Sequence, residues 1–201
     1  MKLSENALKI AKSRYFWENE ESWEQLSNRV CTEISKIEQD QNKMFEEFKS
    51  IIEPMDFIPA GRILRNLGKR RSATSNCYVL PIEDSIESIG STLRDYLIVS
   101  SYGGGSGINF SSLRPIGAEL KTKGGTSSGV VSFIKMFDQS GKCIETGGAR
   151  RSAAIALLDV SHPEVIDFIN AKTKHDELNQ FNISVVISDT FLKAVEREEN
   201  W

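Results

Sequence analysis

The sequence has few of the residues that mark several large classes of protein. Cysteine occurs only three times in 201 residues, as Cys31, Cys77 and Cys143. This odd number at wide spacing excludes both a secreted disulfide framework and a CxxC metal pair. The two histidines, His162 and His175, are too far apart along the chain for us to expect a metal site built from them. No apolar run approaches the roughly 18–20 residues that would span a bilayer.

An excess of either charge is also missing. The chain carries 25 Lys and Arg against 28 Asp and Glu, for a formal net charge of −3, and this balance gives no support for a nucleic-acid-binding surface. Charged residues are interspersed through Met1–Ile10, which therefore does not look like a signal peptide. We expect a cytoplasmic protein that has neither a membrane nor a nucleic acid as its partner. Two local basic clusters, at 69–71 and 150–151, are large enough to hold a small phosphate ligand.

Residues 3–53 show the periodicity of amphipathic helices. Apolar side chains recur at intervals of three and four residues in three successive segments. Ser22 is placed to cap the second segment, and Pro54 is placed to end the third. We predict a helical domain over residues 1–56, in which Cys31 is a buried or half-buried thiol.

Residues 57–201 have a different texture, in which short apolar segments alternate with turns rich in glycine and serine. Strands are expected near 77–80, 107–110, 152–158 and 183–187, and helices near 84–99, 130–137, 162–169 and after Ser188–Asp189. Such alternation is typical of an α/β sheet or barrel. Too few strands are present to close a barrel, so either a partner polypeptide completes the sheet or the chain is a fragment.

Three polar segments rich in glycine are candidates for ligand contact: 101–107, 124–129 and 147–152. Amide groups in such loops can point at an anion, and a neighbouring arginine such as Arg150 can pair two phosphate oxygens. The same composition also suits ordinary turns, and the residues alone leave both interpretations open. The residues alone also leave two interpretations of Cys77. It begins an apolar strand, where barrel enzymes carry catalytic groups, but a thiol that only packs is the simpler interpretation.

Several segments together resemble the catalytic subunit of ribonucleotide reductase in their order along the chain. They are Phe57–Leu64, Ser75–Leu80 with Asp84–Ile86, Tyr102–Phe110 with Leu113–Pro115, Gly147–Ala154, and Asn182–Val185. The resemblance runs from about residue 5 to the last residue. It implies an α/β fold in which an N-terminal helical domain is followed by a ten-stranded α/β barrel. This chain would hold only the first part of that barrel, over residues 57–201.

Within that family the sequence is most similar to the adenosylcobalamin-dependent class II. Pro59–Arg62 and Gly103–Gly107 look like that class, and the helical segment begins without the ATP-binding domain of many class I subunits. The resemblance implies adenosylcobalamin as the cofactor, with its contacts expected mostly in the missing half. The iron-dependent class I large subunit shares the same core and is the alternative. The glycyl-radical class fits less well, because it does not use a cysteine pair at the position that Cys77 matches.

The resemblance implies roles for residues around the substrate. Cys77 matches the first of two cysteines that reduce the ribose and become a disulfide. That role is chemically reasonable, because a dithiol supplies the two electrons that reduction of the 2′-hydroxyl requires. Asn76 and Gly105 match positions that contact the substrate, and Ala60 matches a backbone contact to the substrate's phosphates. No residue is assigned to a metal.

The same resemblance implies a second nucleotide site, for a deoxynucleotide effector. Asp84 matches a carboxylate that binds the effector's deoxyribose hydroxyl, and Arg114 matches a cation at the effector's phosphates. Residues 117–129 and 147–154 correspond to the first and second specificity loops, and the second loop links the effector to the substrate. The other effector contacts implied are Ser85, Ile86, Lys121 and Arg150, with Arg150 reaching between the two ligands.

Much of the family's active site is missing from this sequence. The radical-forming cysteine, its neighbouring asparagine and glutamate, and the partner of Cys77 belong to the family's later half, and Cys143 matches none of them. We therefore expect the N-terminal part of a ribonucleoside-diphosphate reductase, inactive until a complementary C-terminal half is supplied. The partners implied are a ribonucleotide substrate, deoxynucleotide effectors, a thioredoxin-like reductant and a second copy in a homodimer. A non-catalytic nucleotide-binding remnant is the alternative, and it would not require Cys77.

Overall fold

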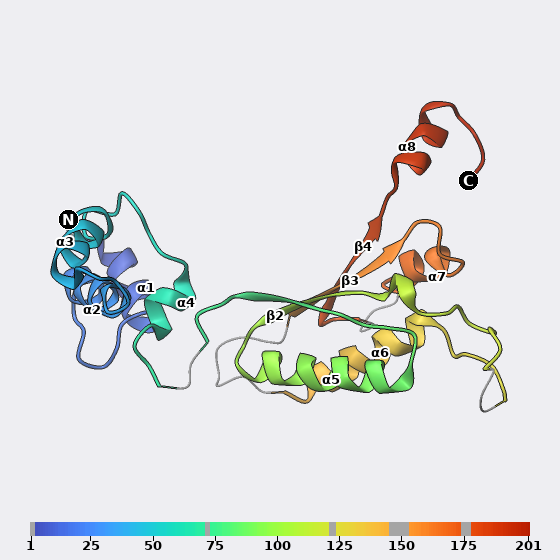
Figure 1. Ribbon diagram of the computed structural model, residues 1–201, viewed down its shortest axis with the longest axis horizontal. Helices are drawn as coiled ribbons and strands as arrows, with labels where there is room; N and C mark the ends of the chain where they lie inside the picture. The colour runs from blue at the N-terminus through green and yellow to red at the C-terminus, as the bar shows by residue number, and fades with distance from the viewer. Residues whose placement is uncertain (1–2, 71–72, 121–123, 145–152, 174–177) are drawn as a thin grey trace. The chain divides into compact units, whose positions relative to one another are not determined.

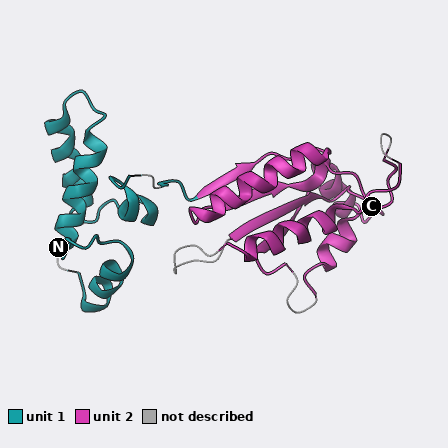
Figure 2. Ribbon diagram, turned by 90° about the horizontal axis from the view of Figure 1, so that it is seen from below, with its two compact units in different colours: residues 1–76 teal, residues 77–201 magenta. Residues whose placement is uncertain are grey.

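The computed structural model describes residues 3–70, 73–120, 124–144, 153–173 and 178–201. The chain divides into two compact units, Met1–Asn76 and Cys77–Trp201 (Figure 2). Unit 1 is helical, and unit 2 combines helices with strands, so the expected order of a helical domain before an α/β domain is confirmed. No helix within the described ranges is both long and apolar enough to cross a membrane.

The described part of unit 1 consists of helices and their connections. The helices are α1 (Glu5–Arg14), α2 (Trp23–Ser35), α3 (Gln41–Ile52) and α4 (Gly61–Asn66). Ser22 caps α2 as predicted, because its hydroxyl accepts a hydrogen bond from the Gln25 amide. The core consists of Trp23, Leu26, Val30, Cys31, Ile52 and Leu64. The Cys31 thiol is fully buried there, and this burial raises its pKa to about 11.

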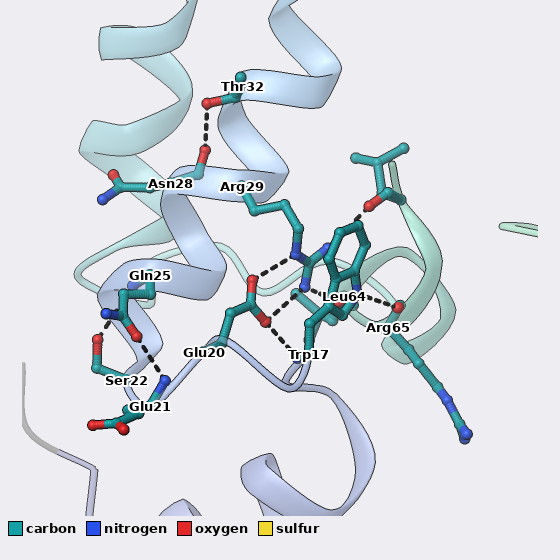
Figure 3. Close-up of polar contacts among 11 residues, drawn as sticks. Trp17, Glu20, Glu21, Ser22, Gln25, Asn28, Arg29, Thr32, Leu64 and Arg65 are labelled. Carbon is teal, nitrogen blue, oxygen red and sulfur yellow. Dashed lines mark hydrogen bonds and ion pairs between the residues drawn. The ribbon is translucent and has the colours of Figure 1, made fainter. Parts of the chain in front are cut away.

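A buried ion pair holds the shortest helix of unit 1 in place (Figure 3). Nε of Arg29 lies 2.6 Å from Oε1 of Glu20, and both side chains are largely buried. Arg29 also donates hydrogen bonds to the carbonyl oxygens of Leu64 and Leu67 at the C-terminal end of α4. Its guanidinium stacks over the Trp17 ring at 4.2 Å. A helix of six residues is too short to be stable alone, so these tertiary contacts explain why α4 forms in a segment whose composition indicated turns.

The packing of α4 also decides where the two units divide. Leu64 belongs to the helical core, and residues 57–76 therefore lie in unit 1. The expected boundary after residue 56 differs from this division for that reason. As a consequence, Ala60 and Asn76 belong to unit 1, whereas Cys77 and Gly105 belong to unit 2.

Unit 2 is built on a parallel four-stranded sheet with the strand order β1-β2-β3-β4. Its elements are, in chain order, β1 (Cys77–Leu80), α5 (Ile86–Ser101), β2 (Gly105–Asn109), the 3₁₀ turn η1 (Phe110–Ser112), α6 (Val130–Lys142), β3 (Ala153–Asp159), α7 (Val165–Asn170), β4 (Phe181–Val186) and α8 (Asp189–Glu196). The predicted strands and helices of this region are present, with shifted ends. Within the described ranges β1 and β4 each have one neighbouring strand, so the sheet is not closed into a barrel, as expected.

Among the described residues of unit 2, helices cover one face of this sheet and leave the other face open (Figure 1). Successive strand residues point to opposite faces, and the helix-facing residues form one core with α5, α6 and α7. This core includes Tyr96, Phe110, Ile134, Phe137, Ala156, Leu158 and Phe168. On the open face Val79 is 90% exposed, and Ile155 and Leu157 are half-buried. Strands that are apolar on both faces are typical of parallel sheets covered on both sides, such as those of α/β barrels.

Candidate functional site

Cys77 begins β1 on the open face of the sheet. The strand register pairs Cys77 with Gly105 and Gly105 with Ala153, so these three residues form one row where the strands begin. Because neighbouring strands lie ~4.8 Å apart, about 10 Å separates the backbone of Cys77 from that of Ala153. The Cys77 thiol is exposed. In the described chain it is therefore not a packing residue, which was the simpler interpretation of its local sequence.

The glycines before β2 serve two different purposes. A Cβ at Gly104 would lie 2.6 Å from Cγ1 of Val99 and 2.9 Å from the ring of Tyr78, so close packing requires glycine there. Gly103 has a φ of 69°, which is the left-handed conformation that glycine favours. This part of the glycine run forms the turn from α5 into β2, whereas Gly105 lies beside Cys77 in the sheet.

The two substrate candidates of unit 1 are both exposed. Ala60 precedes α4, and its carbonyl oxygen accepts hydrogen bonds from the amides of Ile63 and Leu64. Asn76 is the last residue of the unit and precedes β1 directly. Their contact with a substrate stays a prediction from the resemblance.

Asp84 and Arg114 are brought together beyond the ends of β1 and β2. Nε of Arg114 donates to Oδ2 of Asp84 at 2.7 Å, and the Arg114 amide donates to Oδ1 at 3.2 Å. The side chains are 35% and 34% exposed, so the pair is open to solvent and adds little to stability. A carboxylate oxygen has two lone pairs and a guanidinium has five N–H donors. Asp84 can therefore accept a hydrogen bond from a ligand hydroxyl group while Arg114 donates hydrogen bonds to a phosphate.

The segment matched to the first specificity loop is a hairpin. Glu119 and Thr126 form an antiparallel bridge, and the Ser127 amide donates to the Ala118 carbonyl oxygen at 2.8 Å. Its turns use glycines with positive φ, which are Gly117, Gly124, Gly125 and Gly129. Arg114 connects to this hairpin by donating from Nη1 to the Glu119 carbonyl oxygen at 3.3 Å. Lys121, an expected effector contact, lies outside the described residues.

The other expected effector contacts are distributed between two regions. Ser85 is the N-cap of α5, where its hydroxyl accepts from the Ser88 amide at 3.1 Å, and Ile86 is the exposed first residue of that helix. Arg150 and most of the second specificity loop lie outside the described residues. The last two residues of that segment begin β3, and the first of them, Ala153, is in the row that contains Cys77.

His162 and Glu164 were predicted only as the start of a helix, yet they contact the segment that carries Arg114. Nε2 of His162 lies 2.9 Å from the Leu113 carbonyl oxygen, and Glu164 accepts two amide hydrogen bonds at the base of the hairpin. The local sequence could not predict these three hydrogen bonds, because the bonded residues are 34 to 49 positions apart in the chain. Both residues are buried.

Comparison with known proteins gives matches over nearly the whole chain. Residues 1–72 match the family described as "Ribonucleotide reductase, all-alpha domain", and residues 75–201 match "Ribonucleotide reductase, barrel domain". A vitamin B12-dependent ribonucleoside-diphosphate reductase of Mycobacterium tuberculosis is 38% identical over 98% of this chain and 30% of its own length. A protein of the same name from Thermoplasma acidophilum is 37% identical over 76% of this chain and 20% of its own length.

A solved structure shows the same fold. The class Id ribonucleotide reductase alpha subunit of Actinobacillus ureae superposes with a TM-score of 0.78 at 20% identity, covering 98% of this chain and 36% of that subunit. The chain thus spans less than a third of the length of the two curated relatives.

Proposed function

The chain belongs to the ribonucleotide reductase family, and we therefore propose that it supplies the N-terminal part of an enzyme that reduces ribonucleotides to 2′-deoxyribonucleotides. The observation that carries this proposal is the row of Cys77, Gly105 and Ala153. It puts an exposed thiol beside glycine backbone on the face of the sheet that the helices leave open.

Cys77 is proposed as one of the two thiols that reduce the ribose. Exchange of the C2′–OH bond for a C2′–H bond consumes two electrons and two protons and releases water, and two thiols supply both as they form a disulfide. Cys31 is not the second thiol, because it is buried in the core of unit 1. We assign the second thiol and the radical-forming cysteine to a complementary C-terminal part. A thioredoxin-like reductant in the cytoplasm would then reduce the disulfide back to the dithiol.

A deoxynucleoside triphosphate is the proposed ligand of Asp84 and Arg114. These two residues lie beyond the C-terminal ends of the strands, whereas the second specificity loop enters β3 at Ala153, at the N-terminal ends. The length of β2, about 16 Å, separates the two positions. We further propose that the chain acts as a homodimer.

The names of the two relatives support adenosylcobalamin as the cofactor of the complete enzyme. When bound, it would supply the radical that starts the reaction. Both ring nitrogens of His162 are occupied by hydrogen bonds within unit 2, so this residue is not free to hold cobalt. Within the described ranges no group of three or more His, Cys, Asp and Glu is arranged to hold a metal ion. We assign the cofactor's contacts to the C-terminal part.

The effector assignment is tested by nucleotide binding. The chain is combined with its complementary C-terminal part, and binding of dTTP and dATP is measured by calorimetry. Because a hydrogen bond to a charged group contributes about 1.5–3 kcal/mol, Asp84→Ala and Arg114→Ala should each weaken binding roughly 10- to 150-fold. Arg94→Ala is the matched control, since Arg94 pairs with Asp95 on the exposed surface of α5. An affinity unchanged by both site substitutions would remove the effector assignment.

A nucleotide-binding remnant and a class I subunit remain the alternative functions. Both the remnant and the reductase require Asp84 and Arg114, but only the reductase requires Cys77. An adjacent reading frame that encodes the missing cysteines and glutamate would favour the reductase, and the cofactor that activates the complemented enzyme would separate the two classes.

A further inference from the structure

The turn between β3 and α7 contains two polar side chains that the proposed reaction does not use. His162 and Glu164 are only 8% and 4% exposed. Burial of polar and charged groups costs free energy unless hydrogen bonds compensate. His162 forms a hydrogen bond with a backbone group before the Gly117–Gly129 hairpin, and Glu164 forms hydrogen bonds with backbone groups on both sides of it.

One oxygen of Glu164 joins these two ends. Oε2 accepts a hydrogen bond from the Ile116 amide at 3.0 Å and another from the Val130 amide at 2.9 Å. Val130 is the first residue of α6, where amides lack partners within the helix and a negative charge is favoured. Gly129 leaves space for the carboxylate, since a Cβ there would lie 2.5 Å from Oε1 of Glu164.

His162 holds the chain just before Arg114. The Glu164 amide donates to Nδ1 of His162 at 3.1 Å, so Nδ1 carries no proton and the ring's proton is on Nε2. Nε2 then donates to the Leu113 carbonyl oxygen at 2.9 Å. His162 thus fixes the residue before Arg114, and Glu164 fixes Ile116 after it. The amide and guanidinium of Arg114 meanwhile face Asp84.

We propose that Glu164, supported by His162, is a positioning residue for the nucleotide site of Asp84 and Arg114. It holds Arg114 in its binding orientation without contacting the effector, and the inference rests on the effector function proposed above. Loss of the carboxylate would leave the buried Val130 amide and the part-buried Ile116 amide without this acceptor and allow the hairpin other conformations. A nucleotide would then bind only the fraction of molecules in the competent conformation, so its affinity would fall in proportion.

The test compares two buried carboxylates of unit 2. Glu164→Ala removes the shared acceptor, whereas Glu164→Gln retains an amide oxygen that can accept both bonds. Asp138→Ala and Asp138→Asn are the matched controls, because Asp138 is fully buried and accepts from the Gln180 amide at 2.8 Å. His162→Asn is a milder variant, since its side-chain oxygen can replace Nδ1 but no group replaces Nε2. The dTTP affinity and the reduction rate against dTTP concentration are measured for each, with the C-terminal part present.

We expect Glu164→Ala to weaken dTTP binding by about tenfold or more, because the two hydrogen bonds that its carboxylate accepts would be lost. Glu164→Gln should restore most of the affinity, and His162→Asn should lower it in the same direction. At saturating dTTP the reduction rate should return to that of the unsubstituted enzyme. An unchanged affinity in both Glu164→Ala and His162→Asn, or an equal loss in the Asp138 variants, would overturn the positioning role alone. Absence of saturable dTTP binding by the unsubstituted assembly would instead overturn the effector function, and the inference with it.

Discussion

At the scale of single residues, exposure separates the three thiols. Cys31 is fully buried in the core of unit 1, whereas Cys77 and Cys143 are exposed. The thiolate is the reactive form of cysteine, and the raised pKa of Cys31 keeps that residue protonated at neutral pH. Burial and a raised pKa therefore both disfavour reaction at Cys31.

Timed alkylation should reveal this difference. With iodoacetamide at pH 8, Cys77 and Cys143 should be modified well before Cys31, as followed by peptide mass spectrometry, and Cys77→Ser identifies the signal of residue 77. The folded pKa of Cys31 exceeds the ordinary thiol value of 9.0. The stability linked to this thiol is therefore complete below pH 9 and is lost as the pH rises towards 11. Modification of Cys31 at the rate of Cys77 in the folded chain at pH 8 would contradict the assigned burial.

Functional roles of single residues could be predicted only where the residues lie in a motif of the family. Cys77, Asp84 and Arg114 were identified through the resemblance, and the structure brings the last two together as an ion pair. The exposure of Cys77 could not be predicted, because a strand of four residues has no pattern that tells which face a helix covers. Glu164 was missed because its hydrogen-bond partners come from a distant part of the chain.

At the scale of elements, local signals predicted most of the fold of unit 2. Ser188 caps α8 as expected, and the apolar run of β3 indicated a strand. The exception in unit 1 is α4, whose carbonyl groups are satisfied by Arg29 from another helix. Its formation depends on tertiary contacts that no sequence window contains.

Two glycines near α5 allow a paired test of packing. Gly104→Ala should destabilise the protein by about 1–3 kcal/mol, because the added methyl group would overlap Val99 and Tyr78. Gly90→Ala should stabilise it by roughly 0.5–1 kcal/mol, because Gly90 is in the helix interior and a Cβ there meets no atom within 4 Å. The unfolding midpoint in urea measures both effects. Equal tolerance of the two substitutions would show that packing does not require Gly104.

At the scale of the whole molecule, the sheet keeps the two candidate nucleotide sites apart. The candidate reducing thiol lies where the strands begin, and the candidate effector pair lies beyond where they end. The strand order was not predictable from composition, because parallel pairing joins segments distant in sequence. The resemblance to a barrel enzyme supplied the architecture, and the register then revealed that Ala153 shares a row with Cys77.

The central claim is that the Cys77 thiol is oxidised when a ribose is reduced. It is tested most directly by one turnover of the complemented enzyme without external reductant, followed by alkylation and peptide mapping. We predict that Cys77 becomes part of a disulfide in proportion to the deoxyribonucleotide formed, and that Cys77→Ser forms none. A Cys77 that stays a free thiol while product accumulates would contradict the claim.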